Sequence, residues 1–120
     1  MKQESPSQRI QAVNYTDDIQ APDIKVLDAL TETLNHDKNI NVRMAAAYSL
    51  AKYADRKSVR DSLVASLSQQ TEPIIQIVLM NILVEKKESS AIKPIQKIMS
   101  DEKAMKEVKD VAQKGLNILL

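Results

Sequence analysis

The chain has 120 residues, of which 43% are hydrophobic and 28% are charged. These values are typical of one globular domain and exclude a disordered chain, which has fewer branched apolar residues and a larger net charge. Seventeen basic and sixteen acidic residues leave a net charge of +1, so the basic excess of most nucleic-acid-binding proteins is absent. The lack of cysteine excludes disulfides, thiolate nucleophiles and thiolate metal ligands.

The rarest residue types favour an all-α fold. The chain has one glycine, three tyrosines and no phenylalanine or tryptophan. Sheets need glycine-rich turns and faces rich in aromatic and β-branched side chains, and this composition is poor in both glycine and aromatics. No apolar run approaches the roughly 20 residues that span a bilayer, so direct membrane insertion of this chain is not expected.

Start and stop signals predict helices over residues 7–19, 23–35 and 39–54. Ser7 is the expected N-cap of the first helix, and Asp23 is that of the second. After a polar turn, either Asn39 or Asn41 caps the third helix.

The same signals predict four more helices, over residues 58–69, 73–86, 89–100 and 103–119. Ser58 precedes Asp61 by three residues, which is the spacing of a capping box. Pro73 fits the first turn of its helix, where a missing N–H costs little. Pro94 is compatible with a helix only if it also lies in a first turn.

Apolar residues recur with a period of about 33 residues, and within each repeat they are three and four positions apart. The repeated positions are Leu30, Leu34, Val42, Ala46 and Leu50, then Leu63, Leu67, Ile75, Leu79 and Leu83, and less regularly Ile95, Met99, Val108, Ala112 and Leu116. Each repeat therefore reads as a helical hairpin. Short loops make about seven helices antiparallel, which predicts an α-solenoid over residues 8–120 preceded by a disordered segment at 1–7.

One repeat resembles the short HEAT-like repeat of bacterial, lyase-type proteins. The residues that carry this resemblance are Leu30, Leu34, Asp37, Val42, Arg43 and the run from Ala45 to Ala47. The resemblance implies stacked hairpins and a structural ion pair between Asp37 and Arg43. Later repeats depart from the pattern, with Gln76 where an arginine is expected and Lys109 in the third repeat.

A narrower resemblance concerns residues 11–51, which are similar to a HEAT-like C-terminal region of some bacterial membrane proteins. In those proteins a zinc-finger anti-sigma segment and one transmembrane helix come before this region. The resemblance implies that the chain is the periplasmic, partner-binding part of a membrane-anchored regulator, with any anti-sigma activity outside it. Without it, a cytoplasmic location is expected.

No catalytic, metal-binding or cofactor-binding residue is predicted. The only histidine, His36, lies in a solvated turn that lacks the pocket a general base requires. Lys103, Lys106 and Lys109 alternate with acidic residues, which indicates an ion-paired surface and not a nucleic-acid site. A diverged HEAT-like lyase or enzyme accessory subunit remains an alternative.

The helix at 73–86 has apolar residues on more than one face. The equivalence between repeats predicts that Ile75 and Leu79 face the core. It also predicts that the residues on the opposite side of this helix form a strip with equivalent residues of the neighbouring repeats. The predicted strip contains Ile10, Met44, Tyr48, Ile77, Met80, Asn81 and Val84. In HEAT-like proteins these helices line the concave side, so the strip is predicted to bind a protein or peptide segment. Two alternatives are that neighbouring helices cover the strip, or that it closes a weak homodimer.

Overall fold

The computed structural model describes residues 5–16 and 22–120. Within these ranges all regular structure is helical, as the composition predicts. The chain divides into two compact units, residues 1–54 and residues 55–120. The expectation that residues 8–120 form a single domain stays a prediction.

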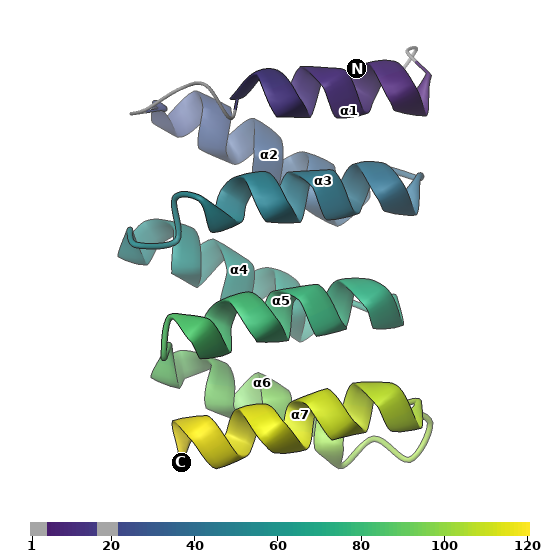
Figure 1. Cartoon of the computed structure of the whole chain (residues 1–120), viewed down its shortest axis with the longest axis vertical. Helices are drawn as coiled ribbons and strands as arrows, with labels where there is room; N and C mark the ends of the chain where they lie inside the picture. Colours follow the sequence, from purple (N-terminus) through teal and green to yellow (C-terminus); the bar gives the residue numbers. More distant parts are fainter. Residues whose placement is uncertain (1–4, 17–21) are drawn as a thin grey trace. The chain divides into compact units, whose positions relative to one another are not determined.

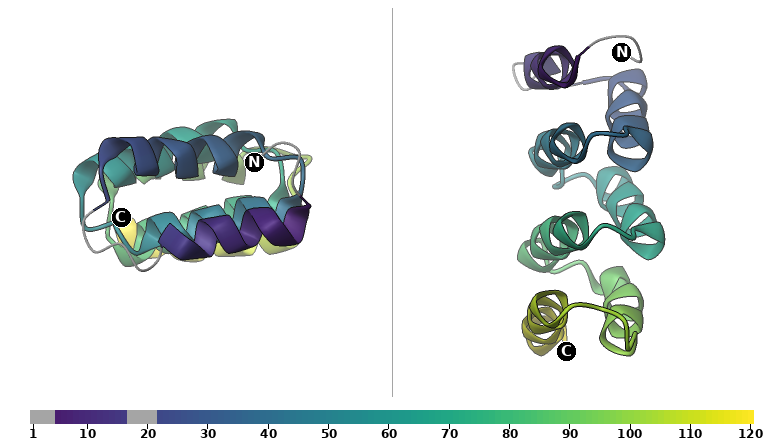
Figure 2. Two further views of the ribbon diagram at one scale, coloured as in Figure 1. Left: turned by 90° about the horizontal axis from the view of Figure 1, so that it is seen from above. Right: turned by 90° about the vertical axis from the view of Figure 1, so that its right-hand side faces the viewer.

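The described residues of the first unit form three helices in two layers. Figures 1 and 2 show the first and third helices side by side in one layer and the second helix in the other. These helices are α1 (Pro6–Tyr15), α2 (Ile24–His36) and α3 (Ile40–Ala51). The repeated apolar residues meet between the layers, where Leu30, Leu34, Val42, Ala46 and Leu50 are buried.

Helix α1 begins earlier than its predicted N-cap, Ser7. Ser5 is the N-cap, and its hydroxyl accepts a hydrogen bond from the Gln8 amide while the Gln8 side chain accepts one from the Ser5 amide. Pro6 occupies the first helical position, where its fixed φ favours the helix. The reciprocal bonds stabilise this start, so residues 5–7 belong to the helix and its cap. The predicted helix end near residue 19 lies outside the described residues.

The second unit repeats the two-layer arrangement. Its elements are α4 (Lys57–Gln69), α5 (Pro73–Glu85), the 3₁₀ turn η2 (Ser89–Ala91), α6 (Ile92–Met99) and α7 (Lys106–Leu119). Helices α5 and α7 lie side by side in one layer, and α4 and α6 lie in the other (Figures 1 and 2). Pro94 lies in the first turn of α6, as the sequence requires.

The predicted capping box of α4 is wrong. The helix begins at Lys57, one residue before Ser58, and its N-cap residue Arg56 makes no side-chain cap hydrogen bond. Asp61 instead accepts a hydrogen bond from Lys57 at 3.1 Å, one helical turn away. The carboxylate that was to close the box thus forms an ion pair on the helix surface.

The single glycine allows two helices of the second unit to approach closely. A Cβ atom at Gly115 would stand 2.9 Å from Cγ2 of Val84 and 3.8 Å from Cδ1 of Ile95. Gly115 lies inside α7, where glycine costs about 1 kcal/mol relative to alanine. The close packing of α7 on α5 therefore explains a residue that helix propensity disfavours.

We expect Gly115→Ala to lower the free energy of unfolding by about 1–3 kcal/mol, since overpacking outweighs the gain in helix propensity. The branched Val84 side chain has little freedom to move aside. Adding Val84→Ala should make the Gly115 substitution less costly than it is in the wild-type background. Urea denaturation of the four chains tests this double-mutant cycle, and strictly additive effects would contradict it.

Candidate functional site

The residues of the predicted strip differ in exposure. Tyr48 is 57% exposed and Asn81 is also exposed, whereas Met80 is fully buried. The half-buried members are Ile10, Met44, Ile77 and Val84. Because Ile10, Met44 and Tyr48 belong to the first unit and the others to the second, each group is considered within its own unit.

The prediction that Met80 projects from the hairpin onto a free surface is wrong. Met80 lies about 40° from Val84 around α5, on the flank of the helix that approaches Gly115 of α7. Periodicity within one hairpin distinguishes only the core of that hairpin and the arc opposite to it. In stacked hairpins a neighbouring helix also covers the flank, so Met80 belongs to the core.

The position of α1 beside α3 identifies a residue that the sequence argument missed. Arg9 and Val13 are buried on α1, 33 residues before the buried Val42 and Ala46 of α3. The Thr16 and Ser49 hydroxyls, also 33 residues apart, lie 2.8 Å from each other. The α1 residue equivalent to Tyr48 is therefore Tyr15, and Ile10 is equivalent to Arg43. The same 33-residue spacing between the two tyrosines is visible in the sequence.

Two of the three tyrosines in the chain are exposed on these neighbouring helices. Tyr15 is 76% exposed and Tyr48 is 57% exposed. The third, Tyr53, is buried, and its hydroxyl donates a hydrogen bond to the Thr16 carbonyl oxygen at 2.8 Å. This bond and the contact between Thr16 and Ser49 hold the end of α1 beside the end of α3. The first unit thus presents Tyr15 and Tyr48 from adjacent positions.

The prediction that Asp37 forms an ion pair with Arg43 is wrong. Asp37 pairs instead with Arg9, whose Nε and Nη2 donate to the two carboxylate oxygens at 2.7 and 3.1 Å. Arg43 donates from Nε to the Leu34 carbonyl oxygen at 3.0 Å. The bidentate contact lets the planar guanidinium of Arg9 satisfy both oxygens of a carboxylate that is only 10% exposed.

The environment of Asp37 favours its ionised form. Burial alone would raise the pKa of this carboxyl group. The hydrogen bonds from Arg9 and from the Asn39 amide, together with the Arg9 charge, outweigh burial and bring the pKa below its ordinary value. Asp37 therefore joins α1 to the turn between α2 and α3 as a charged group.

The second unit contains a similar ion pair that the sequence analysis missed. Arg60 of α4 donates from Nε to Oε1 of Glu88 at 2.8 Å, and Oε2 of Glu88 accepts from the Ser90 amide and hydroxyl. The hydrogen bond from Arg60, followed by those from Ser90, lowers the pKa of Glu88 to about 2. In both units the arginine comes 28 residues before the acidic residue, which lies in the turn that follows the next helix. Both pairs hold turns in place.

Nothing in the described part of the chain provides an obvious reaction centre. His36 is exposed, as predicted, and its Nε2 lies 3.9 Å from Glu32. The described residues include no group of three histidine or acidic side chains that could hold a metal ion. None of their helices combines the length and the apolar character needed to cross a membrane.

A known family of repeat proteins matches this chain in sequence. The family model of HEAT repeats matches residues 1–79, which is more than half of the 120 residues. Neither a curated protein nor a solved structure matches the chain. The matched region covers all of the first unit and continues into α5, and the helical layers of both units agree with the α-solenoid class predicted from the 33-residue period. The chain belongs to the HEAT repeat family.

Proposed function

We propose that the chain is a non-enzymatic module that binds a protein segment through the tyrosine face of its first unit. This face consists of Tyr15 and Tyr48 with the half-buried Met44. The observation that carries the proposal is the exposure of both tyrosines in a chain that has only three aromatic residues. Tyrosine is enriched among the residues that dominate binding energy, since its ring buries a large area and its hydroxyl tolerates water.

The residues around the tyrosines support an apolar partner. Met44 has a flexible thioether side chain that adapts to partners of different shape. It lies one helical turn before Tyr48 on the same side of α3. The expected ligand is a protein segment that inserts apolar side chains between the two rings. Repeat proteins of this kind commonly bind partners on such extended surfaces.

The cellular context is a separate part of the proposal. The resemblance of residues 11–51 to the C-terminal region of membrane-anchored bacterial regulators supports a periplasmic sensor or partner-binding role. Reading the coding sequence of the natural gene tests this. A transmembrane stretch preceded by paired cysteine and histidine residues would support the regulator. A full-length gene product without such a segment would leave only the binding module.

The tyrosine face is tested by the double variant Tyr15→Ser with Tyr48→Ser. Both side chains are exposed, so we expect the free energy of unfolding to change by less than about 1 kcal/mol. The partner is identified by capture from extracts of the source organism, purified, and its Kd measured by calorimetry. The double variant should raise this Kd at least tenfold, or about 1.4 kcal/mol.

The matched control is Asn81→Ser with Lys114→Ser, which changes the equivalent exposed positions of α5 and α7. These substitutions should leave the Kd unchanged. An unchanged Kd in the tyrosine variant would overturn the proposal. Light scattering distinguishes the alternative of homo-oligomerisation. A stable dimer that the tyrosine variant converts to monomers would mean that the face binds a second copy of the chain.

A further inference from the structure

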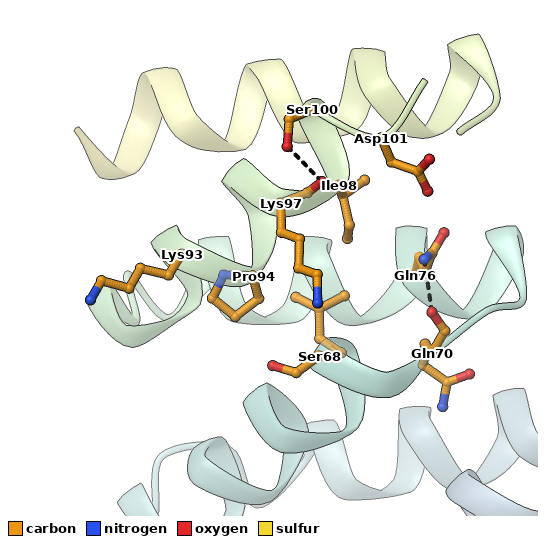
Figure 3. A pocket seen from close by; sticks show the side chains of 10 residues that line it. Ser68, Gln70, Gln76, Lys93, Pro94, Lys97, Ile98, Ser100 and Asp101 are labelled. Carbon is orange, nitrogen blue, oxygen red and sulfur yellow. Dashed lines mark hydrogen bonds between the residues drawn. The ribbon is translucent and has the colours of Figure 1, made fainter. Parts of the chain in front are cut away.

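The second unit contains an open groove beside the C-terminal end of α4. Two adjoining hollows of about 550 and 260 Å³ make up this groove, and they share Gln70, Gln76, Ile98 and Asp101. The larger hollow, shown in Figure 3, lies between the ends of α4 and α5 and the side of α6. We call the two hollows together the α4–α6 groove.

Unpaired positive charge lines this groove. Lys93 and Lys97 stand one helical turn apart on α6, and Lys97 extends from α6 toward α4 in Figure 3. Among the residues that the structure describes, neither lysine has a carboxylate within ion-pair distance. Lys103 lines the smaller hollow. The lysine side chains of the groove are therefore available to bind an acidic ligand.

The one acidic residue of the lining does not neutralise these lysines. Asp101 follows α6, and its Oδ1 accepts a hydrogen bond from the Lys103 amide at 2.9 Å. Helix α6 itself contains no acidic residue. By contrast, Lys57, Arg60 and Lys86 of the same unit all form ion pairs with acidic side chains. Lys93 and Lys97 thus lack the nearby carboxylates that these three basic residues have.

The rest of the lining combines apolar and polar groups. Leu67, Pro94 and Ile98 contribute apolar surface. Gln76 occupies the position equivalent to Arg43 but makes a different contact, donating from Nε2 to the Gln70 carbonyl oxygen at 2.9 Å. Glutamine is shorter than arginine and uncharged, so this contact adds no cation of its own. A ligand here meets lysines on one side, an apolar floor, and amide and hydroxyl groups nearby.

We propose that the α4–α6 groove binds an extended acidic peptide segment of another protein. Charge complementarity selects an acidic ligand. Lys93 and Lys97 extend from α6 in different directions in Figure 3, so they can contact acidic side chains at separate places along one segment. The two adjoining hollows give the groove a length that suits an extended segment. This site lies in the other unit and uses none of the tyrosine face.

The probe is a short fluorescein-labelled peptide in which glutamate alternates with leucine, titrated with the whole chain. We expect saturable binding by fluorescence anisotropy, with NMR amide shifts concentrated in residues 67–76 and 93–103. Lys93→Gln with Lys97→Gln should weaken binding at least tenfold. A peptide with glutamine in place of glutamate should not bind. The variant with Tyr15→Ser and Tyr48→Ser should bind the probe as the wild type does.

The matched control is Lys106→Gln with Lys114→Gln, which removes the same charge from exposed positions of α7 outside the groove. This control should keep the wild-type affinity. Equal losses in both lysine variants would overturn the proposal, because binding would then follow net charge alone. Absence of probe binding to a folded chain would also overturn it. So would tighter binding of a single-stranded oligonucleotide with the same lysine dependence, which would make the groove a phosphate site.

Discussion

Replacing Arg60 with methionine is expected to lower the free energy of unfolding by about 2–4 kcal/mol at neutral pH. The substitution leaves the Glu88 carboxylate in place with its side chain only 9% exposed, and it removes the charged donor at 2.8 Å. The loss is expected to be smaller than that of a fully buried pair because 21% of the Arg60 side chain reaches solvent. Urea denaturation followed by circular dichroism measures it.

The control for this prediction is an ion pair of the same unit that solvent surrounds. Lys86 donates to Asp55 at 2.8 Å, but the Asp55 side chain is 88% exposed. Exposed ion pairs contribute little, because water and salt screen both charges. Lys86→Met should therefore leave the urea midpoint nearly unchanged. If Lys86→Met and Arg60→Met destabilise the chain equally, burial does not give the Glu88 pair its importance.

The same pair predicts a pH window. The folded-state pKa of Glu88 is about 2, against an ordinary value of 4.5. A carboxyl group whose pKa is depressed by folding stabilises the folded state above its unfolded pKa. This contribution is lost as the pH falls from 4.5 to about 2. Over that interval the wild type should lose more stability than Arg60→Met, so their unfolding free energies converge. Profiles that stay parallel would contradict the assigned cause of the pKa shift.

Several features that depend on near neighbours could be predicted from the sequence, although the caps of α1 and α4 were not. Asp23 caps α2 as expected, and Asn39, one of the two expected candidates, caps α3. Both accept hydrogen bonds from backbone amides of the first helical turn. The 33-residue period also places Leu63 and Leu79 in the core, where both are fully buried. These predictions succeed because capping and helical periodicity involve residues within a few positions of each other.

The missed caps of α1 and α4 are local features, and the other missed features depend on how helices pack beside each other. Two serines near the start of α1 are both suitable caps, and the flanking Pro6 and Gln8 favour Ser5 over Ser7. The pairing of Arg9 with Asp37 spans 28 residues and a whole helix, so no local pattern reveals it. The pattern of apolar residues indicates which faces of α5 avoid water. It does not distinguish a face covered by a neighbouring helix, where Met80 lies, from one open to a partner.

The burial of Met80 leads to the second large effect. Met80→Ser should lower the free energy of unfolding by about 2–5 kcal/mol, since it removes a fully buried side chain, leaves a cavity and places a hydroxyl among apolar groups. Met80→Leu keeps the volume and the apolar character, so it should cost less than about 1.5 kcal/mol. Urea denaturation of both variants measures the difference.

Two further substitutions give reference values for the loss of unfolding free energy in the Met80 variant. Leu63→Ala removes a fully buried side chain of α4 and should also cost about 2–5 kcal/mol. Asn81→Ser changes the exposed neighbour of Met80 on α5 and should cost less than about 0.5 kcal/mol. Met80→Ser should resemble the Leu63 variant in stability. If it resembles the Asn81 variant and weakens partner binding instead, Met80 is accessible in solution and belongs to a binding surface on α5.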